Sequence, residues 1–283
     1  MNPIPKLAPG QVAEIVERAL REDLGNGDVT TRASVPDDSR ARAVITQKQP
    51  GVIFGLDCAK QAFERLDREA RFERRCSEGL ERDGGEVAVI EGSARALLAA
   101  ERTALNLLGR LSGVATVARR YVKAVEGTGA RILDTRKTTP GLRLFEKAAV
   151  AAGGGTNHRV GLFDAFLLKE NHIAMAGGIE RAVALCREAD PGLLLEVEVR
   201  NLTELVEAIE SGADRIMLDN MDLGQMRTAV GITAGRAELE ASGGVSLESV
   251  RAIAETGVDF ISVGAITHSA PTLDLSLLLE PLG

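Results

Sequence analysis

From residue 130 onward, short apolar segments alternate with amphipathic segments that have helical periodicity. Strand, loop and helix repeated in this order predict a parallel sheet covered by helices, as a barrel or as a doubly wound sheet. The predicted strands are residues 131–133, 165–168, 194–199, 215–218, 238–241 and 260–263, and the clearest helices are 179–188, 202–210 and 247–255.

Polar residues follow nearly every one of these strands, and this favours the barrel, because barrel enzymes carry their chemistry at the carboxyl ends of the strands. A complete eight-stranded barrel takes about 250 residues. Only about 140 residues are available here, so we predict an α/β fold with an incomplete, open TIM-like barrel. The residues at the strand ends are Asp134, Lys169, Glu198, Asp219, Ser242 and Gly264.

The first part of the chain has a different pattern, typical of a small α+β unit. Residues 28–31 are expected to lie outside any helix. A long helix is predicted from residue 93 to about residue 125, and Gly109 and Gly113 are expected to interrupt it, since glycine disfavours helix interiors. The other predicted elements are helices at 11–24 and 58–66 and strands at 41–45, 51–55, 71–75 and 86–91.

The overall charge excludes some partners. The 283 residues carry a formal net charge of -7, so a nucleic-acid or anionic-membrane surface, which needs a basic face, is not expected. No apolar run approaches the roughly 20 residues of a spanning helix, and the N-terminus lacks the apolar core of a signal peptide. We therefore expect a soluble cytoplasmic protein, in which Cys58, Cys76 and Cys186 are reduced.

Against this acidic background, cations gather in the segment from residue 131 to 172. Arg136 and Lys137 follow the first predicted strand, Lys169 follows the second, and a glycine run between them leads into His158 and Arg159. Arginine binds carboxylates bidentately and lysine acts as a point charge. The segment therefore predicts a site for an anionic substrate.

Two glycine-bearing loops after the last strands predict a phosphate site. Ser242-Gly243-Gly244 precedes a helix expected to open at Ser246, which would offer backbone N–H groups to an anion. Gly264 before Ala265 would let a phosphate approach the main chain. The alternative is that these are ordinary turn and capping glycines. All three histidines, His158, His172 and His268, fall in loops at or near this end.

Two carboxylates end adjacent strands, Glu198 in VEV and Asp219 in LDN. Together they could hold Mg²⁺, which prefers oxygen ligands and keeps waters that it shares with phosphates. Alternatively, each carboxylate pairs with one of the nearby cations and only neutralises it.

Ordered motifs spread along the chain resemble the quinolinate phosphoribosyltransferases, the carboxylating nicotinate-nucleotide pyrophosphorylases of NAD biosynthesis. The resemblance implies an N-terminal α+β sandwich at residues 1–112, joined by the C-terminal segment 271–283, and an open barrel of roughly seven strands at residues 113–270. Glu170 stands where relatives often have Asp. The motifs are EDLGNGDVTT, ERTALNLLGRLSG, DTRKTTPGLR, KAAVAAGGGTNHRVGLFDAFLLKENHI, VEV, MLDNM, ASGGVS and SVGAITHS.

The resemblance also implies an activity and its residues. Such an enzyme converts quinolinate and phosphoribosyl pyrophosphate to nicotinate mononucleotide, pyrophosphate and CO₂, uses Mg²⁺, and is a homodimer or higher oligomer in which Arg102 reaches the partner's site. By this resemblance, the pyridine dicarboxylate is bound by Arg102, Thr135, Arg136, Lys137, His158, Arg159 and Lys169. The 5-phosphate is held by Ser242, Gly243, Gly244, Gly264, Ala265 and His268. The residues that take part in catalysis are Lys137, Lys169, Glu198 and Asp219, and the last two of these contact metal and ribose.

Three other interpretations compete. A nicotinate phosphoribosyltransferase would share the architecture and the cosubstrate but take a monocarboxylate, whereas the density of cations favours a dicarboxylate. Lys169 at a strand end could instead form the Schiff base of an aldolase. A module that only binds a phosphorylated ligand would explain the glycine loops but leaves Glu198, Asp219 and the cations without a role.

Overall fold

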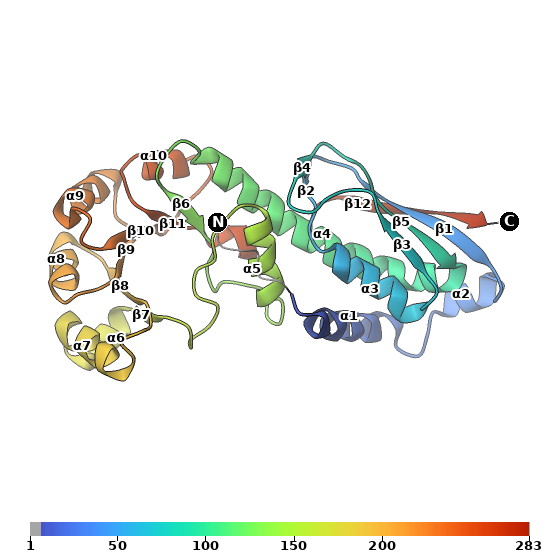
Figure 1. Ribbon diagram of the computed structural model, residues 1–283, viewed down its shortest axis with the longest axis horizontal. Coiled ribbons are helices and arrows are strands. Elements are labelled where there is room, and N and C mark those ends of the chain that lie inside the picture. Colours follow the sequence, from blue (N-terminus) through green and yellow to red (C-terminus); the bar gives the residue numbers. More distant parts are fainter. Residues whose placement is uncertain (1–6, 283) are drawn as a thin grey trace. The chain divides into compact units, whose positions relative to one another are not determined.

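A computed structural model describes residues 7–282, and the chain divides into two compact units (Figure 1). The first unit comprises the chain up to Arg119, the stretch Leu144–Gly154 and the chain from Ala270 onward, and the second comprises Arg120–Arg143 and Gly155–Ser269. No helix among residues 7–282 combines the length and the apolar character needed to cross a membrane.

The first unit is built on a four-stranded antiparallel sheet with the order β12-β1-β5-β3. Alternate residues of the central strand β1 are buried, so Ala41, Ala43 and Ile45 pack into the core while their neighbours face outward. The C-terminal strand belongs to this unit because it pairs with β1. The strands are β1 (Arg40–Gln47), β3 (Arg71–Arg74), β5 (Gly85–Ser93) and β12 (Leu275–Leu282), with a separate ribbon of β2 (Gly51–Val52) and β4 (Glu81–Arg82).

The prediction that residues 28–31 lie outside a helix is wrong. Asp28 is the N-cap of a short helix, and its carboxylate accepts the backbone N–H of Thr31 at 3.0 Å. An aspartate before a helix stabilises the first turn by satisfying an unpaired N–H group. The helices of this unit are α1 (Pro9–Leu24), α2 (Val29–Ser34), α3 (Leu56–Leu66), α4 (Ala94–Ala124) and most of α5 (Arg143–Ala152).

Helix α4 is continuous, so the expected interruption at Gly109 and Gly113 does not occur. A Cβ added at Gly113 would lie 2.0 Å from the backbone oxygen of Pro271, and one added at Gly109 would lie 2.8 Å from the Thr272 side chain. The two glycines are therefore present because the segment leading into β12 crosses the helix at close range, which only a residue without a side chain permits.

The second unit is a six-stranded parallel sheet with the order β6-β11-β10-β9-β8-β7. Figure 1 shows α7, α8, α9 and α10 following one another along the outer side of this curved sheet. The predicted open TIM-like barrel is confirmed. The elements are β6 (Arg131–Leu133), β7 (Phe166–Leu168), α6 (Glu170–Ala176), α7 (Ile179–Ala189), β8 (Leu195–Val199), α8 (Leu202–Glu210), β9 (Arg215–Asp219), α9 (Leu223–Thr233), β10 (Glu238–Ser242), α10 (Val250–Ala254), β11 (Phe260–Ser262) and α11 (Ala265–His268).

Two details of the barrel differ from expectation. Instead of a further strand, Thr156 makes a single bridge to Leu133 beside β6, so the described residues give six strands rather than roughly seven. The helix expected to open at Ser246 begins only at Val250, because Ser246 and Ser249 close a turn through their own backbone and hydroxyl groups.

Candidate active site

A cavity of about 160 Å³ opens at the carboxyl ends of the barrel strands, and it brings together most of the predicted cations. Four cationic side chains line it, and Leu167 and Met217 add apolar surface suited to the face of an aromatic ring. This cationic pocket is lined by Thr135, Arg136, Lys137, His158, Arg159, Leu167, Lys169, Met217, Glu240, Ser242 and Ser262.

The loop that carries Arg136 and Lys137 is fixed from two sides. Thr267 donates its hydroxyl to the Lys137 carbonyl at 2.8 Å. The guanidinium of Arg143 donates to the Thr138 hydroxyl at 2.9 Å and to the backbone oxygen of Val160 at 3.2 Å. Arg143 thus joins the two loops that supply the cations. Sequence reasoning did not identify it, although it belongs to the same DTRKTTPGLR motif.

The loop that carries His158 and Arg159 is held by two carboxylates. Asp134, which is fully buried, accepts the backbone N–H of His158 and the side-chain amide of Asn157, both at 2.8 Å. Asp164 accepts the backbone N–H groups of residues 160 and 161 at 2.6 and 2.8 Å. Acceptors on both sides therefore hold the backbone from which the Arg159 side chain extends.

The electrostatics of this pocket call for an anion. Burial, followed by the neighbouring Arg136 guanidinium, lowers the pKa of Arg159, although an arginine remains charged at neutral pH. Two like charges held close together in a partly buried site repel each other, and a bound carboxylate relieves this repulsion. The predicted site for an anionic substrate therefore has a matching cavity.

Two glutamates that sequence reasoning missed lie beneath the pocket. Glu196 and Glu240 are fully buried, and their carboxylate oxygens lie 2.9 and 3.5 Å from Nε2 of His158. Burial raises the pKa of Glu196 to about 7, and burial and the adjacent Glu196 raise the pKa of Glu240 to about 8. The available signal was an acidic residue inside an apolar strand, two positions before Glu198 in LEVEV and inside LEAS.

These three side chains have ligand-like spacing, and they are in ion-pair contact rather than in well-formed hydrogen bonds. Their ligand atoms lie within 4.8 Å of one another. However, Nδ1 of His158 accepts the backbone N–H of Arg159 at 2.8 Å, so the ring proton of the neutral imidazole is on Nε2, which faces the carboxylates. A protonated nitrogen cannot bind a cation, and the geometry therefore does not favour a metal here.

The two predicted metal ligands stand at the carboxyl ends of adjacent strands. Glu198 pairs in register with Met217, two residues before Asp219. Glu198 forms an ion pair with Lys169, and Asp219 accepts the side-chain amide of Asn220 at 2.9 Å. The first of these contacts is the pairing that the sequence left open as an alternative to metal binding.

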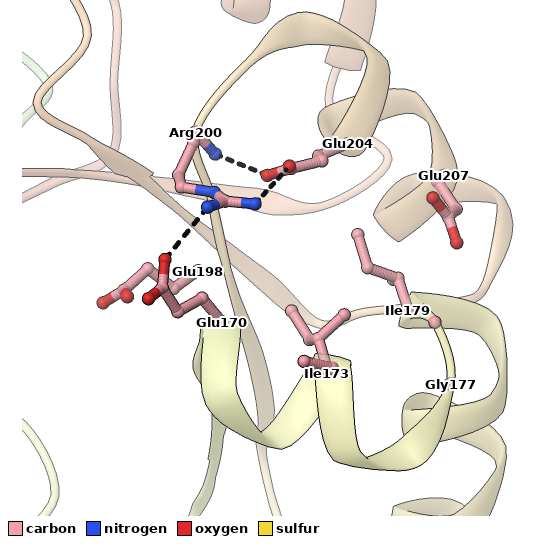
Figure 2. Close-up of a pocket in the computed structure, with 10 residues that line it drawn as sticks. Glu170, Ile173, Gly177, Ile179, Glu198, Arg200, Glu204 and Glu207 are labelled. Atoms are coloured by element: carbon pink, nitrogen blue, oxygen red, sulfur yellow. Dashed lines mark hydrogen bonds and ion pairs between the residues drawn. The ribbon is translucent and has the colours of Figure 1, made fainter.

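A second cleft, of about 320 Å³, lies beside this ion pair and is shown in Figure 2. Arg200 lies between two of its glutamates, with N–O distances of 2.9 Å to Glu170 and 3.1 Å to Glu204. Glu198 also lines the cleft. The carboxylate of Glu170 is therefore engaged in this cleft, and Glu170 does not line the cationic pocket.

The predicted phosphate loops follow β10 and β11, which are neighbours in the sheet. Gly243 has a φ of +102°, and a Cβ at this position would lie 2.1 Å from Oδ1 of Asn220. A Cβ at Gly264 would lie 3.2 Å from both the His268 ring and the Lys137 side chain. Asn220, which was not predicted, donates its backbone N–H to Ser242 and so fixes the first loop.

Arg102, His172 and His268 do not line the cationic pocket, and the two histidines lie in short helices rather than in loops. Arg102 is exposed on α4 in the first unit. His172 accepts the backbone N–H of Lys169 at 3.0 Å and so supports the start of α6. His268 ends the short helix α11, which begins at Ala265, and its Nδ1 lies 2.6 Å from the Ser269 hydroxyl.

An open parallel barrel with a cationic pocket and two glycine loops at its carboxyl end defines an α/β-barrel protein with a pocket suited to an anionic ligand. The model of the quinolinate phosphoribosyl transferase C-terminal domain matches residues 114–278, and that of the N-terminal domain matches residues 28–112. The chain therefore belongs to the quinolinate phosphoribosyltransferase family.

Individual proteins agree with this assignment. The chain is 42% identical over 269 residues to the probable nicotinate-nucleotide pyrophosphorylase (carboxylating) of Bacillus subtilis, which covers 94% of this chain and 93% of that one. It is 42% identical over 271 residues to the Mycobacterium leprae enzyme of that name, with 93% and 95% covered. The solved nicotinate-nucleotide pyrophosphorylase of Francisella tularensis superposes with a TM-score of 0.95 at 41% identity, over 99% of this chain and 100% of that one.

Proposed function

We propose that this protein is a carboxylating nicotinate-nucleotide pyrophosphorylase, a pentosyltransferase of NAD biosynthesis. It converts quinolinate and phosphoribosyl pyrophosphate to nicotinate mononucleotide, pyrophosphate and CO₂. The observation that carries the proposal is that Arg136, Arg159 and Lys169 line one cavity, in a chain whose relatives bear this activity in their names.

Quinolinate is bound by the cationic pocket. Arg136 and Arg159 suit its two carboxylates because a guanidinium forms paired hydrogen bonds with a carboxylate. Lys169 supplies a further positive charge, and Thr135, Lys137 and His158 complete the wall. Leu167 and Met217 contact the apolar faces of the pyridine ring.

Phosphoribosyl pyrophosphate is bound next to this pocket. Its 5-phosphate lies against the two glycine loops, where Ser242, Gly243 and Gly244 offer one set of contacts and Gly264, Ala265 and His268 the other. Glu198 and Asp219 fit Mg²⁺, because they are two oxygen donors at the ends of adjacent strands. The bound ion would supply positive charge that stabilises the departing pyrophosphate.

The chemistry follows from the placement of these charges. As pyrophosphate leaves, positive charge develops at C1 of the ribose, and the carboxylates of Glu198 and Asp219 stabilise it. Lys137 stabilises the negative charge on the leaving group. The pyridine nitrogen then bonds to C1 as the bond from C1 to pyrophosphate breaks. The adjacent positive nitrogen stabilises the electron pair that remains at C2 when the 2-carboxylate leaves as CO₂, and a proton from solvent adds to C2 to complete nicotinate mononucleotide.

The proposed domains and assembly follow the family. The sandwich takes residues 1–112 with 271–283, and the barrel takes 113–270. The boundary between the two family models at 112–114 supports the first division, and the pairing of β12 with β1 supports the return of the C-terminal segment. In a homodimer, Arg102 of one subunit enters the site of the other. Leu162 and Phe163, which are 75% and 77% exposed next to the site loop, support an interface on this face. A higher oligomer built from such dimers is compatible with this arrangement, and we place the enzyme in the cytoplasm.

The direct test is to mix the purified protein with phosphoribosyl pyrophosphate, Mg²⁺ and either quinolinate or nicotinate, and to separate the products by chromatography. The proposal expects nicotinate mononucleotide from quinolinate alone. Product from nicotinate would instead support a nicotinate phosphoribosyltransferase. The ion pair of Lys169 with Glu198 differs from the apolar surroundings that activate Schiff-base lysines, so an aldolase is disfavoured.

A further inference from the structure

Two glutamates occupy the interior of the barrel, where aliphatic side chains normally pack. Glu196 on β8 and Glu240 on β10 have no exposed surface, whereas barrel interiors are dominated by Val, Ile and Leu. A buried ion pair or buried acid often stabilises a fold less than an apolar residue of similar size. The two carboxyl groups therefore call for an explanation other than stability.

Both carboxyl groups face the same ring. Nε2 of His158 lies 2.9 Å from an oxygen of Glu196 and 3.5 Å from an oxygen of Glu240. On the other side of the ring, Nδ1 accepts the backbone N–H of Arg159 at 2.8 Å. Each ring nitrogen thus has a protein partner, and the imidazole connects the barrel interior to the backbone of the next residue.

The residue at the end of this connection is a cation of the pocket. The guanidinium of Arg159 donates to the carbonyl of Ala165 at 3.3 Å, a long hydrogen bond. The backbone from which this side chain extends is held by Asp134 through the N–H of His158 and by His158 through the N–H of Arg159.

We propose that Glu196 and Glu240 are positioning residues for substrate binding. Through their contact with Nε2 of His158, they fix the imidazole that accepts the backbone N–H of Arg159, and so they help to hold the backbone from which Arg159 meets a substrate carboxylate. In this assignment His158 acts on the binding site through its neighbour. The inference rests on the proposed function, because it takes Arg159 to bind quinolinate.

Calorimetric binding of quinolinate, without cosubstrate, tests the proposal with paired variants. Glu196→Leu removes the carboxyl group nearest to Nε2 of His158 and should weaken binding about tenfold. Glu196→Gln keeps a carbonyl oxygen for the Nε2–H and should bind within about threefold of the unmodified protein. A group that only filled space would not distinguish these two variants.

Glu255→Leu is the control. Glu255 lies in the same unit, but it pairs with Arg251, at 2.7 Å, rather than with His158 or its neighbours. This variant should bind quinolinate like the unmodified protein. Binding of phosphoribosyl pyrophosphate with Mg²⁺ should stay unchanged in all three variants, because the glycine loops are not part of the network.

Nitrogen NMR of the imidazoles gives a second measurement that does not depend on activity. The chain has three histidines, so the spectrum is simple, and His158→Gln identifies the signals of His158. The proposal expects a proton on Nε2 and none on Nδ1, a state that Glu196→Gln preserves and Glu196→Leu disturbs. A proton on Nδ1, or equal quinolinate binding by the Leu and Gln variants, would overturn it.

The two proposals fail in different ways. A protein that makes nicotinate mononucleotide but whose Glu196→Leu variant binds quinolinate normally would refute only the positioning role. A protein that neither binds nor converts quinolinate would refute the proposed function, while the NMR measurement would still report whether the network exists.

Discussion

Replacing Gly243 by alanine tests the predicted phosphate loop at its most constrained point. The residue has a φ of +102°, and an added Cβ would lie 2.1 Å from the Asn220 side chain. An unfavourable backbone of this kind costs about 1–3 kcal/mol in a residue other than glycine. Displacing Asn220 also breaks its hydrogen bond to the Asp219 carboxylate, and the loss of such a bond to a charged group costs about 1.5–3 kcal/mol.

We therefore expect Gly243→Ala to weaken binding of phosphoribosyl pyrophosphate by about 100-fold, which corresponds to about 2.7 kcal/mol. Quinolinate binding should change little. Gly235→Ala is the control, because Gly235 lies outside the site, has a φ of +77° and has no atom within 4 Å of the added Cβ. That variant should lose about 1–2 kcal/mol at most. Calorimetry and thermal unfolding measure both, and equal affinity and equal Tm in the two variants would refute the reasoning.

Four further predictions concern other parts of the molecule. Arg136→Ala should raise the KM for quinolinate, because each lost charged hydrogen bond costs about 1.5–3 kcal/mol. Arg236→Ala is the control and should leave the KM unchanged, because the Arg236 side chain donates to the Ile232 carbonyl. Steady-state kinetics of the two variants measures this difference in KM. Gly113→Ala should lower Tm, because the added Cβ would lie 2.0 Å from the Pro271 oxygen. Gly231→Ala, at a position inside α9 where no atom lies within 4 Å of the added Cβ, should raise stability by about 0.5–1 kcal/mol. A Tm of Gly113→Ala at or above that of the unmodified protein would contradict this reasoning. The pKa values of Glu196 and Glu240 are raised from 4.5 to about 7 and about 8, so the folded protein keeps protons that the unfolded chain releases. The stability that this pair contributes is fully present below about pH 4.5 and is lost as the pH rises to about 8. Glu240→Gln should therefore flatten the dependence of Tm on pH over this range. Chelation of Mg²⁺ should abolish turnover. Asp219→Asn should weaken the Mg²⁺-dependent binding of phosphoribosyl pyrophosphate and leave quinolinate binding intact, and calorimetry with and without Mg²⁺ can check both affinities.

The periodic part of the fold could be predicted because each barrel strand is a short apolar run between polar loops. The predicted strand at residues 215–218 appears as Arg215–Asp219, and the helix at 202–210 appears as Leu202–Glu210. The expected break in α4 was wrong because a distant segment decides the local structure there. Glycine disfavours a helix, but Gly113 is required inside α4 by the approach of Pro271, and sequence periodicity carries no information about such a contact.

The same difference applies to the candidate site. The cations were visible because charges at strand ends break the apolar pattern of an acidic chain. Glu196 and Glu240 break the pattern as well, but only the fold shows that strands β8 and β10 direct both residues toward His158. Arg143 and Asp134 act through backbone carbonyl and N–H groups, which leave no trace in the side-chain pattern.

Release of the 2-carboxylate tests the central claim most directly. Purified protein is incubated with phosphoribosyl pyrophosphate, Mg²⁺ and quinolinate that carries ¹³C in the 2-carboxyl group, and the products are followed by NMR and mass spectrometry. The account predicts one labelled CO₂ for each nicotinate mononucleotide formed. It would be contradicted by no mononucleotide, or by a mononucleotide that still carries the label.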